Sequence, residues 1–262
     1  MFIYKLIIYK FKMILYFVIV FIVFLFFIIC YQIFDMCRFC GYGGGGSYNK
    51  KYKHTFPHRR KFKSVAETHY SVAGPYQTKQ EIEIFKSLFK KEHPKKIIDA
   101  TAHVGVDSLT LAYTFPSANI TSVERNPVVY ELLKENIESL GYSKHRNGGT
   151  RFTTLNMSAD TYLKDLDHKV DLIYMDPPWG GRGYVETADL PLHDESGNPT
   201  IPLSGVINIA LEKTKILVLK APYNFKVEEF GTKINGKIDR VCNIKRLNDP
   251  SRASFIFIII RT

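Results

Sequence analysis

Short apolar strands alternate with helices along residues 95–232, and this order constrains the fold more than any other feature of the sequence. The expected strands are 95–100, 118–124, 151–156, 169–175 and 215–221, and the expected helices are 107–115, 127–140, 158–164, 202–213 and 224–232. Such alternation is typical of a mostly parallel sheet with helices on both faces. Residues 237–247 and 253–261 are expected to form two more strands around a turn at 248–251, which adds an antiparallel hairpin. The sequence therefore predicts an α/β fold with a seven-stranded sheet.

One more helix is expected before the first strand. Thr78 and Glu81 have the spacing of a capping box, and apolar residues follow at helical intervals. Pro94 is expected to end this helix. The globular domain is thus predicted to span residues 67–262.

The first 35 residues are strongly hydrophobic, and residues 13–34 contain no charged side chain. About 20 such residues are enough for a helix to span a bilayer. Lysines or arginines lie on both sides of the segment, so the positive-inside rule does not give an orientation. The same composition fits AT-rich DNA that lies upstream of the true start codon and has been translated with the gene. In that case Met36 is the true start. Both interpretations, a membrane anchor and a mis-assigned start, are left open.

A basic, glycine-rich arm at residues 36–66 follows the hydrophobic segment. Residues 1–63 contain eleven Lys and Arg and one acid, which leaves a net charge of only +1 of the total +11 for residues 64–262. Four consecutive glycines at 43–46 indicate a flexible linker. We interpret the arm as one that contacts the phosphates of RNA, although an anionic membrane surface or a solvated tail fits the same charge.

The arm also contains Cys37, Cys40, His54 and His58 at a spacing that zinc fingers use. Pro57 stands where a finger needs a helix, so a zinc site is the less favoured interpretation. The four cysteines of the chain do not suggest a disulfide framework. A reducing compartment, the cytoplasm or the nucleus, is therefore expected.

Acidic residues end several of the predicted strands, where α/β sheets bind their ligands. Glu124 follows Gly105 by nineteen residues, which suits a carboxylate that binds a ribose diol, or one that only lies at a strand end. The loop after the first strand has one glycine, not the three of a dinucleotide fingerprint. A ligand with a ribose but no phosphate is indicated, and S-adenosylmethionine meets that description. Asp99 is then placed for its ammonium group and Asp160 for the adenine amine.

The tetrad Asp-Pro-Pro-Trp at 176–179, which holds the chain's only tryptophan, ends the fourth predicted strand. Two prolines stiffen the backbone and remove two N–H donors, so the loop offers carbonyl oxygens and the Asp176 carboxylate as acceptors. These acceptors suit the hydrogens of an exocyclic amine, and the Trp179 ring suits stacking on the base that carries it. A proline-stiffened turn with a core tryptophan is the alternative.

With these residues the chain resembles class I S-adenosylmethionine-dependent methyltransferases that act on amino groups of bases. The stretch DPPWGG, preceded by DATAHVGVDS at 99–108, is most similar to the trimethylguanosine synthase family, whose members methylate N2 of the 7-methylguanosine cap of RNA. The resemblance covers about residues 67–262 and implies a Rossmann-like methyltransferase fold. His103, Val106 and Arg182 depart from the family's usual residues.

The resemblance also implies a role for each matching residue. Asp99, Ala102, Gly105, Glu124, Asp160 and Asp176 would bind the cofactor; Asp176, Pro177 and Trp179 would carry catalysis; and Trp179, Gly180 and Tyr76 would bind the substrate. Residues 70–77, before the first helix, would help to close the pocket. The partner implied is capped RNA, bound through the base pocket and the basic arm by a protein expected to be a monomer.

Three other functions remain to be separated from cap methylation. Adenine-N6 and other base-amino methyltransferases carry the same or a related tetrad. A non-catalytic RNA-binding scaffold is a second alternative, although such relatives usually lose the acid that Asp176 supplies here. A zinc-dependent binding module, based on the Cys37–His58 spacing, is the third.

Overall fold

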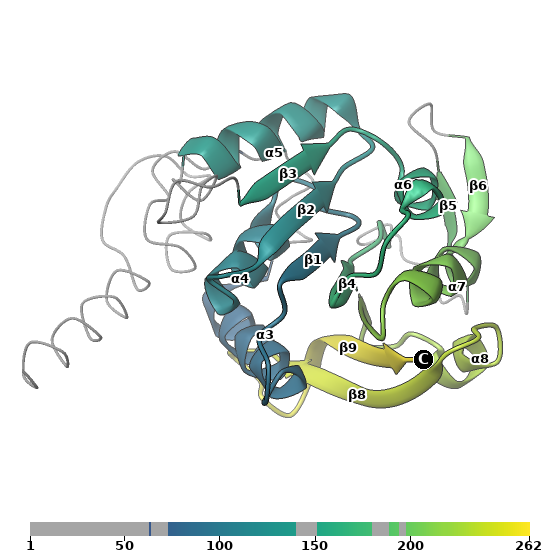
Figure 1. Ribbon diagram of the computed structural model, residues 1–262. Coiled ribbons are helices and arrows are strands. Elements are labelled where there is room, and N and C mark those ends of the chain that lie inside the picture. The colour runs from purple at the N-terminus through teal and green to yellow at the C-terminus, as the bar shows by residue number, and fades with distance from the viewer. Residues whose placement is uncertain (1–62, 64–72, 140–150, 180–188, 194–197) are drawn as a thin grey trace, which may run out of the picture.

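The computed structural model describes residues 63, 73–139, 151–179, 189–193 and 198–262. Its main sheet has seven strands in the order β3-β2-β1-β4-β7-β9-β8 (Figure 1). The strands are β1 (Lys96–Asp99), β2 (Asn119–Val123), β3 (Phe152–Leu155), β4 (Leu172–Met175), β7 (Ile216–Pro222), β8 (Lys237–Lys245) and β9 (Ala253–Arg261). The first five in sheet order are parallel, and β9 pairs antiparallel with both β7 and β8. The predicted α/β class, strand number and terminal hairpin are confirmed.

Helices cover both faces of this sheet. They are α3 (Pro75–Leu88), α4 (Val106–Thr114), α5 (Pro127–Ser139), α6 (Ala159–Asp165), α7 (Leu203–Lys213) and α8 (Val227–Gly231). One apolar cluster joins α3, α4 and α5 to one face, and a second joins α6, α7 and α8 to the other. Consecutive strand residues alternate between them, as with Ile97 in the first cluster and Ile98 in the second. Because the central strands are buried on both faces, their ends are the places where polar groups meet solvent.

The predicted capping box at the start of α3 is wrong. The helix begins four residues earlier, because Pro75 is well suited to the first helical position and Gly74 precedes it in an extended conformation. Thr78 and Glu81 consequently lie inside the helix, and both are buried. The Thr78 hydroxyl donates to the Gly74 carbonyl at 3.1 Å and does not accept from a free backbone N–H, as a capping box would require. The helix also ends at Leu88, well before Pro94.

A second, two-stranded antiparallel sheet was not predicted. It consists of β5 (Pro191–His193) and β6 (Pro199–Pro202). Three of the four strand ends are prolines, which argue against a strand in a sequence-based assignment but are tolerated at strand ends.

The N-terminal predictions lie outside the described residues. These are the hydrophobic segment 13–34, the boundaries at 35 and 66, and the zinc spacing at Cys37, Cys40, His54 and His58. Within the described ranges, no helix has the length and apolar character needed to cross a membrane, and no group of three or more potential metal ligands is found.

Candidate active site

The predicted site residues that follow β1, β2 and β4 lie together at one edge of the sheet. The loop after β1 reaches both neighbouring strands: the Thr101 hydroxyl accepts from the Asp176 backbone N–H at 2.7 Å, and the Ala102 N–H donates to the Val123 carbonyl at 2.8 Å. The loop expected to hold the cofactor is therefore in direct contact with the tetrad expected to hold the substrate amine.

Glu124 joins the loop after β1 to the loop after β2. One carboxylate oxygen accepts from the His103 N–H at 2.9 Å and the other from the Asn126 N–H at 2.7 Å. Burial raises the pKa of this carboxyl group, while the two backbone donors oppose that shift. Each carboxylate oxygen has a second lone pair, so two ribose hydroxyls can still donate to Glu124. Both proposed roles, loop support and ribose binding, fit its geometry.

Asp99 is fully buried at the end of β1. One carboxylate oxygen accepts from the Ser108 hydroxyl at 2.6 Å, which ties β1 to the first turns of α4. Burial raises the pKa of Asp99 to about 8. The predicted contact with an ammonium group stays a prediction, because the Asp99 side chain has no exposed surface for a ligand to touch.

Asp160 lies in the first turn of α6, where its side chain is almost fully buried. One carboxylate oxygen, Oδ2, pairs with the Lys164 ammonium at 3.2 Å. The other oxygen of the same carboxylate can accept from an adenine amine, so this assignment stays a prediction.

Gly105 has a structural role in the same loop. It precedes α4 with a φ of 94°, a left-handed conformation that suits glycine. A Cβ built at this position would lie 2.7 Å from Cδ1 of Leu133, a fully buried residue of α5. A side chain here must therefore displace the Leu133 side chain, the loop or α5.

The Gly105→Ala substitution is expected to lower the free energy of unfolding by about 2 kcal/mol, because it combines a strained φ with overpacking. Urea denaturation measures this loss. Gly205→Ala is the matched control, since Gly205 lies in α7 and a Cβ there has no contact closer than 3.5 Å. Equal stability of the two variants would contradict the assigned role of Gly105.

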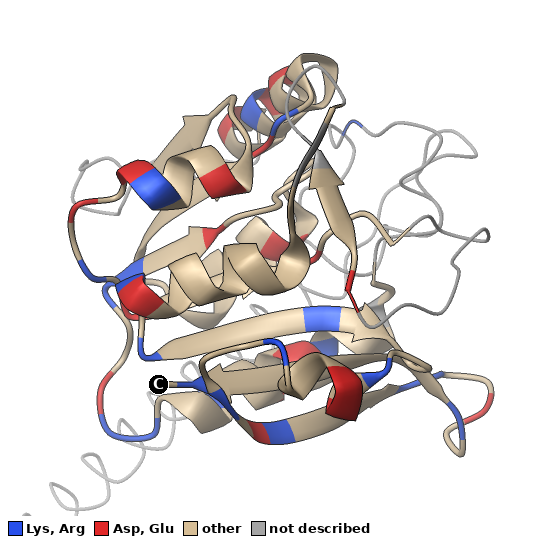
Figure 2. Cartoon of the chain, turned by 90° about the vertical axis from the view of Figure 1, so that its right-hand side faces the viewer, with Lys and Arg blue, Asp and Glu red and all other residues tan. Residues whose placement is uncertain are grey.

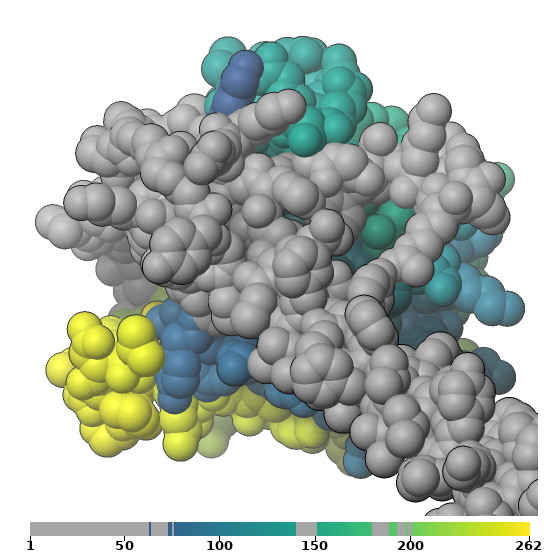
Figure 3. Space-filling view, turned by 90° about the vertical axis from the view of Figure 1, so that its left-hand side faces the viewer, coloured from purple at the N-terminus to yellow at the C-terminus, as the bar shows by residue number. Residues whose placement is uncertain are grey.

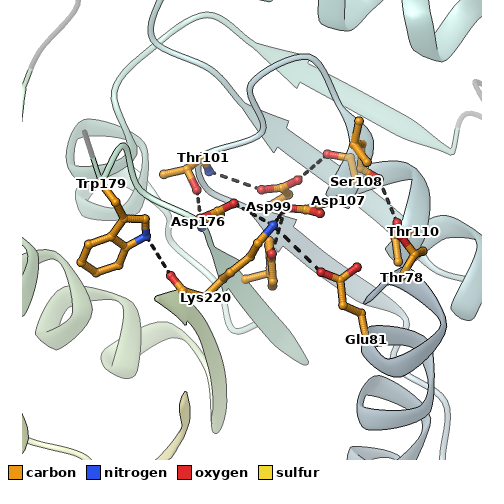
Figure 4. Close-up of polar contacts among 12 residues, drawn as sticks. Thr78, Glu81, Asp99, Thr101, Asp107, Ser108, Thr110, Asp176, Trp179 and Lys220 are labelled. Carbon is orange, nitrogen blue, oxygen red and sulfur yellow. Dashed lines mark hydrogen bonds and ion pairs between the residues drawn. The ribbon is translucent and has the colours of Figure 1, made fainter. Parts of the chain in front are cut away.

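A buried lysine, missed by the sequence analysis, holds Asp176. Lys220 lies in β7, and its ammonium is 2.9 Å from Oδ2 of Asp176 and 3.2 Å from Oδ2 of Asp107 in α4 (Figure 4). A third carboxylate, Glu81 of α3, is 4.0 Å away. The strand alternation places Lys220 on the same face as Ile216 and Val218, under α3 and α4. A lysine in the otherwise apolar run ILVLKAP was the available signal in the sequence.

The group of Lys220 and its carboxylates contains more acid than base. Burial raises the pKa of Glu81 to about 8, with Lys220 opposing the shift, and neither Glu81 oxygen has a hydrogen-bond partner in the described part of the chain. Burial also raises the pKa of Asp176, to about 6, again against the effect of Lys220. Asp176 is therefore expected to lose its proton at lower pH than Glu81 does. Tyr174 adds a neutral donor, its hydroxyl lying 2.8 Å from Asp107 Oδ2.

Trp179 is half-buried beside this group. Its indole N–H donates to the Lys220 carbonyl at 3.0 Å (Figure 4). Its ring meets Phe225 edge-on with 5.1 Å between centroids. These two contacts fix the plane of the indole. Stacking of a base on this ring stays a prediction.

The remaining predicted residues are less informative. Tyr76 lies in the first turn of α3 and not before the helix, as predicted, because the helix starts at Pro75. It is half-buried, and its carbonyl accepts from the Gln80 side chain at 3.2 Å. Gly180 and Arg182 lie outside the described residues, whereas Pro177 is described and buried.

Residues 60–183 match a family model described as "Putative SAM-dependent methyltransferase". The match is to SAM-dependent methyltransferases. A solved SAM-dependent methyltransferase from Agrobacterium tumefaciens superposes with a TM-score of 0.55 at 17% identity, covering 76% of this chain and 66% of that one. This likeness shows the Rossmann-like fold of class I SAM-dependent methyltransferases, and S-adenosylmethionine is the cofactor that the family model implies.

Two curated proteins share part of the sequence. The ribosomal RNA small subunit methyltransferase J of Photorhabdus laumondii is 36% identical over 91 residues, which are 34% of this chain and 36% of that protein. An uncharacterized protein of Acanthamoeba polyphaga mimivirus is 31% identical over 136 residues, 51% of this chain and 48% of that protein. The chain thus spans about a third to a half of the relatives that it matches.

Proposed function

We propose that this methyltransferase transfers a methyl group from S-adenosylmethionine to an exocyclic amino group of an RNA base, and that this amine is N2 of the guanine in a 7-methylguanosine cap. One observation carries the proposal. A half-buried carboxyl group, Asp176, follows β4 directly, is held by Lys220 and Thr101, and precedes two prolines that have no N–H. Such a site accepts hydrogen bonds and donates few, which matches a primary amine and not a carbonyl oxygen.

The roles of the residues follow from this geometry. Bound S-adenosylmethionine supplies an electrophilic methyl group. Asp176 accepts one N–H of the amine and the backbone carbonyl of Pro177 accepts another, so the nitrogen lone pair is directed at the methyl carbon. Lys220 pairs with Oδ2 of Asp176, and the carboxylate, which has about four lone-pair sites, keeps acceptor capacity for the amine. Catalysis then consists mainly of positioning for an in-line displacement.

One proton must leave the nitrogen after its bond to the methyl carbon forms and the carbon–sulfur bond breaks. Asp176 is the carboxylate that contacts this amine in the proposal. With a pKa of about 6 it is ionised at neutral pH and remains able to accept that proton. The proton then passes to water when product leaves.

A second candidate substrate is a base amine within ribosomal RNA. It is favoured by the similarity to the ribosomal RNA small subunit methyltransferase J of Photorhabdus laumondii. The same acceptors would serve either substrate, because both present an exocyclic amine. The choice between them depends on what surrounds the base.

A tritiated methyl-transfer assay on the full chain tests both candidates. The substrates are GTP, 7-methyl-GTP, a capped RNA, the same RNA uncapped, and small-subunit ribosomal RNA. We expect capped RNA to be methylated at least about tenfold faster than uncapped RNA, and a cap analogue to quench the fluorescence of Trp179, the only tryptophan in the chain. Labelling of ribosomal RNA alone would favour the second candidate, and no labelling of any RNA would contradict the proposal.

A further inference from the structure

An exposed aromatic ring lies next to the candidate active site, paired with a guanidinium group. Tyr223 directly follows β7 and is 53% exposed. The guanidinium carbon of Arg246 lies 5.8 Å from the centre of its ring. Leu247, the next residue, is 64% exposed. An aromatic ring beside an arginine is the combination that binds unpaired bases by stacking and their phosphates by charge.

The hairpin that carries Arg246 is held in place. The Arg246 side-chain Nε donates to the Ala253 carbonyl at 3.1 Å, across the turn between β8 and β9. On its other side the hairpin is bound to α3, because the Lys245 N–H donates to the Gln80 side chain at 3.0 Å. Figure 3 shows this end of the hairpin, in yellow, at the surface beside α3, in blue. The guanidinium is thus ordered before any ligand arrives.

The turn is locally basic in a nearly neutral body. Residues 245–252 contain Lys245, Arg246 and Arg252 against Asp249, a net charge of +2, whereas all of residues 64–262 carry +1. The Asp249 carboxylate accepts from the Ser251 N–H at 3.2 Å within the turn itself. Blue segments flank the single red one where the turn projects at the right of Figure 2. This distribution attracts a polyanion to the turn.

The exposed ring is connected to the tetrad. Phe225, two residues after Tyr223, packs edge-on against Trp179. In the sheet, Pro222 of β7 pairs with Phe255 of β9, so the β8–β9 turn lies at the same edge as the ends of β4 and β7. A strand whose target base enters the site beside Trp179 can therefore place a neighbouring nucleotide at Tyr223.

We propose that Tyr223 and Arg246 form a subsite for a single-stranded RNA nucleotide that flanks the methylated base. The flanking base stacks on the Tyr223 ring, and the phosphates next to it contact Arg246 and the lysine and arginine that border it in the turn. This inference rests on the proposed function, since it assigns a surface to the same RNA. The subsite is not base-specific, because every base has a face that can stack.

The test measures RNA binding separately from turnover. Fluorescence anisotropy of a labelled, unstructured capped RNA is recorded with the full chain and its Tyr223→Ala, Tyr223→Phe and Arg246→Ala variants. We expect Tyr223→Ala to raise Kd about tenfold and Tyr223→Phe to change it less than about twofold, because phenylalanine keeps the ring. Arg246→Ala is expected to reduce the slope of log K against log salt by about 1.

Lys237→Ala is the matched control. This exposed lysine begins β8, about 26 Å along the strand from Lys245, and its loss removes the same charge as Arg246→Ala. We expect the control to leave Kd and the salt slope unchanged. A Tyr223→Ala protein that melts like the wild type and binds RNA equally well overturns the subsite. An equal loss of RNA affinity in Lys237→Ala and Arg246→Ala also overturns the subsite, because it would indicate that the RNA is bound by charge alone.

Methyl transfer separates this inference from the proposed function. If the subsite is correct, Tyr223→Ala raises KM for capped RNA about tenfold and leaves kcat/KM for 7-methyl-GTP unchanged. Transfer to RNA with a normal KM in Tyr223→Ala overturns the subsite alone. Tyr223-dependent binding of RNA without any methyl transfer contradicts the proposed function alone.

Discussion

Asp176→Ala is expected to lower kcat for methyl transfer about 100- to 1000-fold, while Kd for S-adenosylmethionine changes less than about threefold. The loss is that of one directed hydrogen bond in a water-poor site, which has this typical size. The fold should persist, because Lys220 keeps Asp107 and Glu81 as partners. Single-turnover transfer and calorimetric titration with the cofactor measure the two quantities.

Asp176→Asn sharpens this test. Asparagine keeps the shape and one acceptor oxygen, but Lys220, at 2.9 Å from Oδ2 in the native protein, is expected to attract that oxygen. The amide NH2 would then face the substrate amine, donor against donor, so asparagine should not restore activity. Asp167→Asn, at a fully exposed aspartate, is the control and should behave as wild type. Full activity in Asp176→Ala would remove the proposed mechanism.

The acceptor role also predicts a pH dependence. Asp176 must be ionised to accept from the amine, and burial raises its pKa to about 6 against the opposing effect of Lys220. The rate should therefore fall as the pH is lowered through about 6. Substituting Lys220 removes the charge that lowers this pKa, so the acid limb of the profile should move to higher pH in such a variant.

The layered order of the fold could be predicted from sequence because its signals are local. Apolar runs bounded by Asp99 and by Asp176 identify buried parallel strands, and each is followed by a helix-forming segment. The start of α3 could not be placed as well. Thr78 and Glu81 match a capping box in spacing, yet Pro75 and the burial of both side chains favour an earlier start. The spacing of residues alone does not reveal which of their side chains the sheet will cover.

The candidate site was predicted only where its residues end strands. Asp99, Glu124 and Asp176 could be found because the carboxyl ends of parallel strands converge. Lys220 and Glu81 could not, because their meeting depends on α3 packing over this face of the sheet, a contact between segments more than a hundred residues apart. Its traces in the sequence are a lysine in a buried strand and a glutamate on the apolar face of a helix. Each is an ordinary surface residue until the packing is known.

Lys220→Met is expected to have the largest effect on stability, a loss of about 3–5 kcal/mol in the free energy of unfolding. Methionine keeps the length of the side chain but leaves Asp107 and Asp176 without the cation that lies 3.2 Å and 2.9 Å from them. Two carboxylates would then share a buried space, and they can relieve the repulsion only by binding protons. Urea denaturation at neutral and mildly acidic pH should therefore show a smaller loss at the lower pH.

A double variant separates the charge from the packing in this prediction. Adding Asp107→Asn to Lys220→Met removes one of the two charges and keeps an acceptor for the Tyr174 hydroxyl, so part of the lost stability, about 1–2 kcal/mol, should return. Lys215→Met, at an exposed lysine just before β7, is the control and should change stability by less than about 0.5 kcal/mol. If Lys220→Met alone is as stable as the wild type, the carboxylates do not depend on Lys220. The proposal that Lys220 holds the Asp176 carboxylate in place as an acceptor would then be contradicted.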